Sequence, residues 1–151
     1  IKMSKDKKNN LKLIAKNEED LNVISAYTQD SIVAVKDITF LKKNRIFIMI
    51  VNRFMWEDIE KGINRHSKRI RCALKFEGVL NVKAKKISQK NKSKLLECLA
   101  IECGRILSKN NQIRFFFAGG GAITLIAESI EAIMRDLGEP WNVKHVPKHK
   151  I

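Results

Sequence analysis

The chain has 151 residues and a formal net charge of +14, with 44% hydrophobic and 30% charged residues. These values are typical of one globular domain that can bury a core without disulfides, and they exclude a collagen-like or strongly disordered chain. The longest apolar run is too short to cross a bilayer and no signal-type apolar segment follows the basic start, so we expect a cytoplasmic protein without a membrane partner.

The positive charge is concentrated in one segment, Lys61–Lys94, which holds twelve lysines and arginines and a single acid, Glu77. The flanking segments almost cancel, with net charges of −1 for residues 11–60 and −2 for residues 95–141. A concentration of one sign creates a local field that attracts anions. We divide the chain into a flexible basic tail (1–10), one domain (11–141) and a basic C-terminal tail (142–151).

The first part of the domain reads as strand, helix and strands. Leu11–Ala15 is a short apolar strand, and Asn17 is a helix N-cap followed by three acids that suit a first turn. Apolar residues every three or four positions then predict a helix over Glu18–Gln29. Ser31–Val35 and Ile38–Leu41 have the composition of strands with a short interruption between them.

The middle of the chain contains two strong strand signals. Arg45–Phe54 is apolar on both faces at its centre, which favours a central strand, and a loop with one helical turn should follow it. Ile70–Phe76 alternates cleanly between apolar and polar residues. Gly78 marks a turn or a bulge, after which Leu80, Val82 and Ala84 should face inward.

The last part begins with strands and ends with an expected helix. Leu99, Ile101 and Cys103 alternate with other residues, so Cys98–Cys103 favours a strand. Two apolar strands then flank Gly119, Gly120 and Gly121, which we interpret as a hairpin turn and not as a phosphate loop, because a strand follows the glycines.

The expected C-terminal helix begins after Ser129 and ends before Gly138. Its apolar residues are spaced i, i+3, i+4 and i+7, at Ile130, Ile133, Met134 and Leu137. The predicted fold is therefore α+β: a curved antiparallel sheet or partly closed barrel of about 6–8 strands with two amphipathic helices packed on it.

The candidate binding residues come from the basic segment. If Gly78 joined two neighbouring strands, Arg71 and Lys75 would lie beside Lys83 and Lys85 on one outward face, and the repulsion between them would favour an anionic partner. The predicted anion-binding residues are Arg65, Lys68, Arg69, Arg71, Lys75, Lys83, Lys85 and Lys86. The alternative is a solvated surface of a lysine-rich chain, since this segment has no outward aromatic side chain for stacking on bases.

The cysteines, histidines and clustered acids are better explained by packing or surface exposure than by catalysis or metal binding. Three cysteines do not make an even disulfide framework, and Cys98 and Cys103 should lie on opposite faces of one strand as reduced thiols. Pro147 separates His145 from His149 and argues against a helical metal pair. The acids near Trp56 are expected to be surface groups, and we expect no metal, cofactor or catalytic residue.

Several short segments are familiar in combination: Leu11–Ala15, Asp20-Leu21, Ile24–Ala26, Gln29-Asp30, Asn52–Phe54, Trp56-Glu57, Phe117–Ile123, Asp136–Trp141, Pro147 and His149. Together they resemble a small family of bacterial, mainly alphaproteobacterial, proteins, domain of unknown function 2948. The resemblance covers about Leu11 to His149 and implies a cytoplasmic single domain without implying an activity.

Three functions remain open from the sequence. The first is a non-enzymatic binding or adaptor domain whose basic face engages RNA, the ribosome or an acidic protein. The second is a protein–protein interaction module, including a homodimer formed along an apolar strand edge. The third is an enzyme whose active site is not visible in the sequence, since none of the known catalytic signatures is present.

Overall fold

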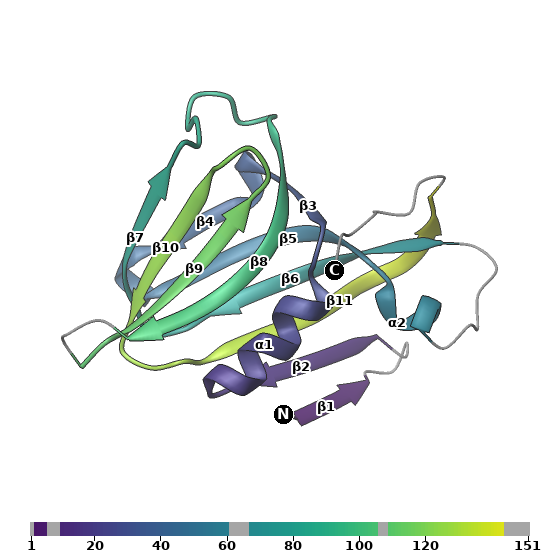
Figure 1. Ribbon diagram of the computed structural model, residues 1–151, viewed down its shortest axis with the longest axis horizontal. Coiled ribbons are helices and arrows are strands. Elements are labelled where there is room, and N and C mark those ends of the chain that lie inside the picture. The colour runs from purple at the N-terminus through teal and green to yellow at the C-terminus, as the bar shows by residue number, and fades with distance from the viewer. Residues whose placement is uncertain (1, 6–9, 61–66, 106–108, 144–151) are drawn as a thin grey trace.

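A computed structural model describes residues 2–5, 10–60, 67–105 and 109–143 (Figure 1). Within these residues eleven strands form one antiparallel sheet in the order β1-β2-β11-β6-β5-β3-β8-β9-β10-β7, with β4 beside β5. The strands are β1 (Lys2–Lys5), β2 (Leu11–Ala15), β3 (Ser31–Ala34), β4 (Ile38–Leu41), β5 (Ile46–Phe54), β6 (Lys68–Phe76), β7 (Val79–Lys85), β8 (Leu95–Arg105), β9 (Asn111–Phe117), β10 (Ala122–Ala127) and β11 (Ala132–Asn142).

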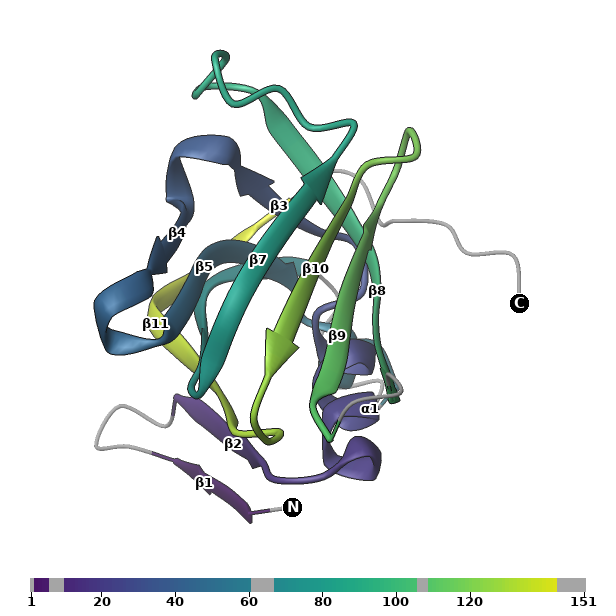
Figure 2. The same ribbon diagram turned by 90° about the vertical axis from the view of Figure 1, so that its left-hand side faces the viewer.

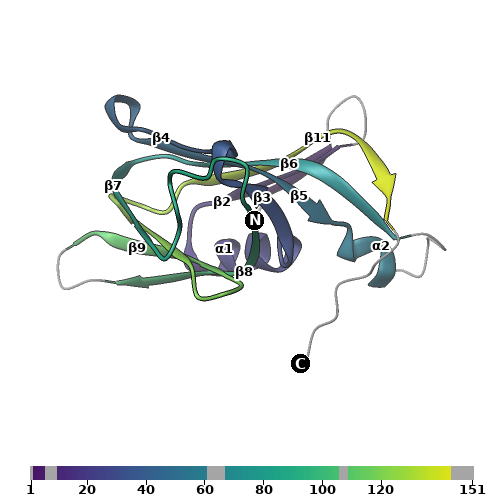
Figure 3. The same cartoon turned by 90° about the horizontal axis from the view of Figure 1, so that it is seen from above.

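The sheet is bent into two facing walls and does not close into a barrel. One wall contains β2, β11, β6 and β5, the other contains β8, β9, β10 and β7, and β3 connects them (Figure 3). The expected antiparallel, curved sheet is confirmed, but the described chain has more strands than the expected six to eight. Residues 2–5, placed in the tail by the sequence analysis, form β1 against β2.

One of the two expected helices packs on the sheet. Helix α1 (Glu18–Tyr27) lies against β8 and β2, with Leu21 and Ile24 fully buried. Its predicted N-cap is confirmed, because the Asp20 N–H donates to Asn17 Oδ1 at 2.8 Å. The other helices are a five-residue turn, α2 (Trp56–Glu60), and two 3-10 turns, η1 (Val35–Asp37) and η2 (Lys42–Asn44).

The expected C-terminal helix is wrong: its residues form β11. Ala132, Met134 and Asp136 are buried toward the core, and the intervening Ile133 is only half-buried on the other face. The strand pairs with β6 over most of its length, and its first four residues also pair with β2 on the other side. Two neighbouring strands satisfy its main-chain groups, and this pairing outweighs the helical spacing of its apolar residues.

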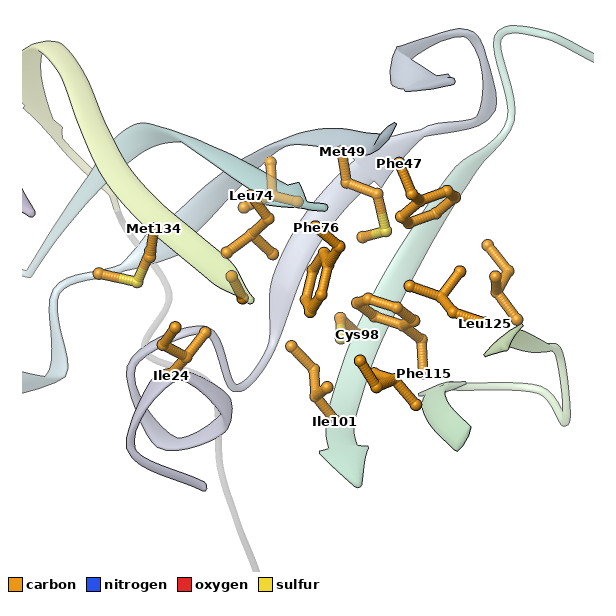
Figure 4. Close-up of a cluster of buried hydrophobic side chains, with 14 of the residues drawn as sticks. Ile24, Phe47, Met49, Leu74, Phe76, Cys98, Ile101, Phe115, Leu125 and Met134 are labelled. Carbon is orange, nitrogen blue, oxygen red and sulfur yellow. The ribbon is translucent and has the colours of Figure 1, made fainter. Parts of the chain in front are cut away.

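Aromatic side chains from both walls meet in the core (Figure 4). The rings of Phe47 on β5 and Phe76 on β6 contact Phe115 on β9, with centroids 5.6 Å and 5.3 Å from that of Phe115. Each of the three side chains is at most 1% exposed. Rings at these distances and tilts add specific attraction to the burial of apolar area, so this cluster holds the two walls together.

The structure changes the expected positions of two cysteines. The register between β8 and β9 shifts between Cys98 and Ala100, which leaves Leu99 unpaired and exposed. Because this bulge adds one residue to the strand, Cys98 and Cys103 both contact the core, and the expected placement on opposite faces is wrong. Cys72 is also fully buried on β6.

Thiol labelling should distinguish the three cysteines. Burial raises the pKa of Cys98 to about 12 and also raises the pKa of Cys72, whereas the half-buried Cys103 is the accessible thiol. We expect a maleimide at pH 8 to label one thiol of the folded protein quickly and the other two only after denaturation. Mass spectrometry of the labelled protein checks this, and rapid labelling of Cys98 in the native state would contradict it.

Candidate functional site

The predicted basic residues of β6 lie on the outer face of the first wall. Arg71 is exposed, and Lys75, four positions further along the strand, makes an ion pair with Glu77 at 3.1 Å. Lys75 therefore has an acidic neighbour of its own. Glu77 and Gly78 connect β6 to β7, and Gly78 has a φ of +69°.

The predicted pairing of β6 with β7 is wrong. β6 pairs with β5 and β11, whereas β7 pairs with β10 on the opposite wall. Gly78 is a crossing between walls and not a hairpin turn, because its carbonyl accepts from the Glu128 N–H and the Glu77 N–H donates to the Glu131 carbonyl. Arg71 and Lys75 consequently do not form one patch with Lys83 and Lys85.

The remaining predicted residues of this group also separate. Arg69 donates from Nη1 to the carbonyls of Asp30 and Asn52 at 3.1 and 3.0 Å, and its guanidinium lies over the ring of Phe54. Burial lowers the pKa of Arg69. Its two hydrogen bonds connect separate main-chain segments of the fold. Lys68 is half-buried at the start of β6, and Arg65 lies outside the described residues.

Cations of the second wall do gather on one outer face. The strand register places Lys83, Thr124 and Arg114 in one row across β7, β10 and β9. The adjacent row contains Lys85, Ala122 and Phe116. We call this surface the lysine face and define it by Lys83, Lys85, Lys86, Arg114 and Phe116. Figure 2 shows its three strands side by side.

Phe116 is the aromatic centre of the lysine face. Its neighbours across the strands are Ala122 on β10 and Ala100 on β8, so small side chains flank the ring on both sides. The Arg114 guanidinium carbon lies 6.0 Å from the centroid of the Phe116 ring. The ring is half-buried with the Arg114 guanidinium over it, and its accessible part presents a surface on which a planar base can stack.

The glycine turn borders this face. The expected hairpin is confirmed: β9 pairs with β10, the Phe117 N–H donates to the Gly121 carbonyl at 2.8 Å, and Gly119 and Gly120 have φ of +86° and +90°. The side chain of Lys86 passes close to Gly120, where a Cβ atom would lie 3.8 Å from its Nζ. The turn without side chains thus leaves room for the Lys86 ammonium group at the edge of the lysine face.

The lysine face carries uncompensated positive charge. Within the described residues, none of its lysines makes an ion pair with an acid. Glu102 lies opposite Arg114 on β8 and bounds the face on that side. On the lysine-rich connection after β7, the side chains of Lys90 and Lys94 are also exposed. Like charges at neighbouring positions repel, and an anion bound between them would relieve that repulsion.

Sequence reasoning missed Phe116 because it stands within three consecutive phenylalanines. Phe115 and Phe117 are at most 2% exposed, and strict alternation along a strand places the middle ring on the opposite side. The sequence shows this alternation. It does not show which strands lie on either side of β9, and those strands decide whether large or small residues flank the Phe116 ring.

A second charged cluster, not found from the sequence, is buried at the end of β5. The fully buried Arg53 forms two hydrogen bonds of 2.7 Å with Asp136 on β11 and two of 2.9 and 2.6 Å with Glu57 on α2. Its guanidinium also lies over the Tyr27 ring, 5.6 Å from the centroid. Glu57 is therefore not the plain surface acid that was expected.

The geometry of the Arg53 cluster indicates a structural role. Both carboxylates bind the guanidinium in a fork geometry, which leaves the arginine's charge compensated on two sides. The Trp56 indole N–H nearby donates to the Gln29 carbonyl at 2.8 Å and so fixes α2 against the end of α1. The segments that meet here, Gln29, Arg53, Trp56, Glu57 and Asp136, are among those that carry the family resemblance.

The histidines considered for metal binding, His145 and His149, lie outside the described residues, as does His66. In the part of the chain that is described, no three His, Cys, Asp or Glu side chains are grouped as metal ligands would be. The helices of that part are also too short and polar to traverse a bilayer.

Comparison with known proteins identifies one match. A family model described as "Protein of unknown function (DUF2948)" matches residues 11–149. Searches of curated proteins and of solved structures found no match. The match covers both the lysine face and the Arg53 cluster, and the family description names no activity.

Proposed function

The chain belongs to the DUF2948 family, and we propose that it is a cytoplasmic, non-enzymatic binding domain whose lysine face holds single-stranded RNA, free or within the ribosome. The observation that carries the proposal is the position of Phe116 between two alanines, on the face that also presents Lys83, Lys85 and Arg114. Single-stranded RNA needs both features, because its phosphates require cations and its unstacked bases require an aromatic platform.

Charge supports an anionic partner of this kind. Lys83 and Arg114 lie two strands apart in the row next to the ring's row, and Lys85 lies two strands from Phe116 in the same row, so each pair is separated by about 10 Å. Lysines bind phosphates as flexible point charges, which suits a partner recognised through its backbone more than through its sequence. We therefore expect weak sequence preference and strong dependence on salt.

The aromatic ring favours RNA over an acidic protein. An acidic protein would be attracted by the same lysines, but it would gain little from an accessible ring without a matching apolar contact. A nucleobase gains about 1–3 kcal/mol from stacking on an aromatic side chain. Truncation of Phe116 therefore separates the two partners, whereas charge reversal alone would weaken both.

The proposal predicts salt-dependent binding that depends on both charge and stacking. We expect a short fluorescein-labelled single-stranded RNA to bind, with affinity falling about 50-fold between 50 and 200 mM salt if four cations contact phosphates. At moderate salt, Lys85→Glu should weaken binding about tenfold and Phe116→Ala at least fivefold. Fluorescence anisotropy at several salt concentrations measures each affinity.

Two matched variants control for charge and for lost apolar area. Arg71→Glu makes the same kind of charge reversal on the other wall, and Ile126→Ala truncates a half-buried outward residue on β10. Both should change the affinity less than twofold. Equal effects of Lys85→Glu and Arg71→Glu would show that only net charge matters. An unchanged affinity in Phe116→Ala, together with competition by an acidic protein, would reject RNA as the partner.

A further inference from the structure

A seam separates β4 from β7, where the sheet fails to close. Within the described part of the chain, β4 pairs with β5 alone and β7 with β10 alone, so the two strands face each other without hydrogen bonds between them (Figure 2). A hollow of about 190 Å³ lies in this seam. Phe47 and Ile123 form its apolar floor, Phe40 and Val82 line its sides, and Gln89 and Lys92 line its rim.

Main-chain hydrogen bonds hold both ends of the seam. At one end the Val35 and Lys36 N–H groups donate to the carbonyls of Lys94 and Lys92 at 3.0 and 2.9 Å. At the other end the Val79 N–H donates to the Arg45 carbonyl at 2.9 Å. The hollow is therefore preformed, and the main chain at Lys92 is fixed beside it.

The bridged ends determine what the hollow can hold. An added peptide strand would have to run along the whole seam, and the hydrogen bonds at both ends stand in its path. A small molecule can enter from the side without breaking them. An apolar cavity of roughly 150 Å³ accommodates benzene, so this hollow admits a body of that size with a small polar group attached.

The rim determines the charge of the ligand. Lys92 is the charged residue that lines the hollow, and no acid lines it. Its ammonium group and the Gln89 amide can donate hydrogen bonds to one carboxylate, while Phe47 and Ile123, 1% and 3% exposed, cover the apolar body. We propose that the seam binds a small amphipathic monocarboxylate with an apolar part about the size of a benzene ring.

This site is separate from the lysine face and does not rest on RNA binding. Lys83 and Lys85 are exposed on the outer side of β7, with Thr124 and Ala122 beside them, whereas Val82 and Ala84 line the hollow. Alternate residues of one strand therefore serve the two surfaces. A variant at one surface leaves the side chains of the other in place.

A ligand series on the unmodified protein tests the proposal. Phenylacetate, 2-phenylethanol and 2-phenylethylamine share one apolar body and differ in charge. We expect phenylacetate to shift NMR signals of Val82, Phe47 and Ile123 saturably, with a Kd on the order of 1 mM. The alcohol should bind at least fivefold more weakly, and the amine should show no saturable shift at these residues.

Substitutions then locate the carboxylate and the apolar body. Lys92→Gln should weaken phenylacetate at least fivefold and leave the alcohol unchanged, whereas Lys90→Gln, an exposed neighbour outside the hollow, should change neither. Ala84→Phe should fill the hollow and abolish both. The proposal is overturned if the acid gives no saturable shift at the seam, if the amine binds as well as the acid, or if the two lysine variants behave alike.

Discussion

Replacing Arg53 with methionine should lower the free energy of unfolding by about 3–5 kcal/mol, because it removes the one cation between two carboxylates. Asp136 is 2% exposed and would keep a charge without a partner in the core, where its desolvation is not repaid. For a chain of this length the melting temperature should fall by roughly 6–20 °C. Denaturant unfolding followed by circular dichroism measures the change.

A surface ion pair provides the matched control for Arg53. Arg45 and Glu128 form an ion pair whose side chains are 56% and 51% exposed, so Arg45→Met should cost less than about 1 kcal/mol. The double variant Arg53→Met with Asp136→Leu should recover part of the loss, since an apolar pair leaves no buried charge. Equal costs for Arg53→Met and Arg45→Met would contradict the structural role of the cluster.

The Arg53 cluster shows why buried charge is hard to predict from sequence. Arg53 and Asp136 are 83 positions apart, and each alone reads as a polar residue on an exposed face. Their burial follows from the pairing of β5 and β11 with opposite sides of β6. Long-range pairing of this kind leaves no local signal, because each strand's pattern reports its own faces and not its neighbours.

Local patterns were sufficient where a residue's role depends on adjacent residues. The Asn17 cap, the buried side of Ile70–Phe76 and the glycine hairpin all follow from spacing, capping and turn chemistry, and the structure confirms each. Local patterns predicted only part of the proposed binding surface. The charge of Lys83 and Lys85 was predicted, but their separation from Arg71 depended on a crossing at Gly78 that local patterns do not distinguish from a hairpin.

The C-terminal strand illustrates a conflict between two periodicities. Ile130, Ile133, Met134 and Leu137 fit a helical stripe, while Ala132, Met134 and Asp136 fit the inner face of a strand. The second pattern was obscured because a charged residue occupies one of its buried positions. Only the partner of that charge, Arg53 on β5, makes the strand pattern consistent with burial.

The two periodicities predict different results for lysine at positions 133 and 134. In a helix both side chains would lie on the buried stripe, so both substitutions would unfold the protein. In β11 Met134 is fully buried and Ile133 is half-buried on the outer face, beside Lys75 and Ile14. We therefore expect Met134→Lys to abolish folding and Ile133→Lys to lower the free energy of unfolding by no more than about 1.5 kcal/mol.

Alanine at the same positions keeps the comparison quantitative if the Met134→Lys protein does not fold. Met134→Ala removes a side chain that the core surrounds and should cost about 2–5 kcal/mol, whereas Ile133→Ala should cost less than half as much. Urea unfolding monitored by tryptophan fluorescence gives both values on one scale. Similar losses at the two positions would mean that Ile133 also faces a core, and the strand assignment that places Asp136 against Arg53 would then be wrong.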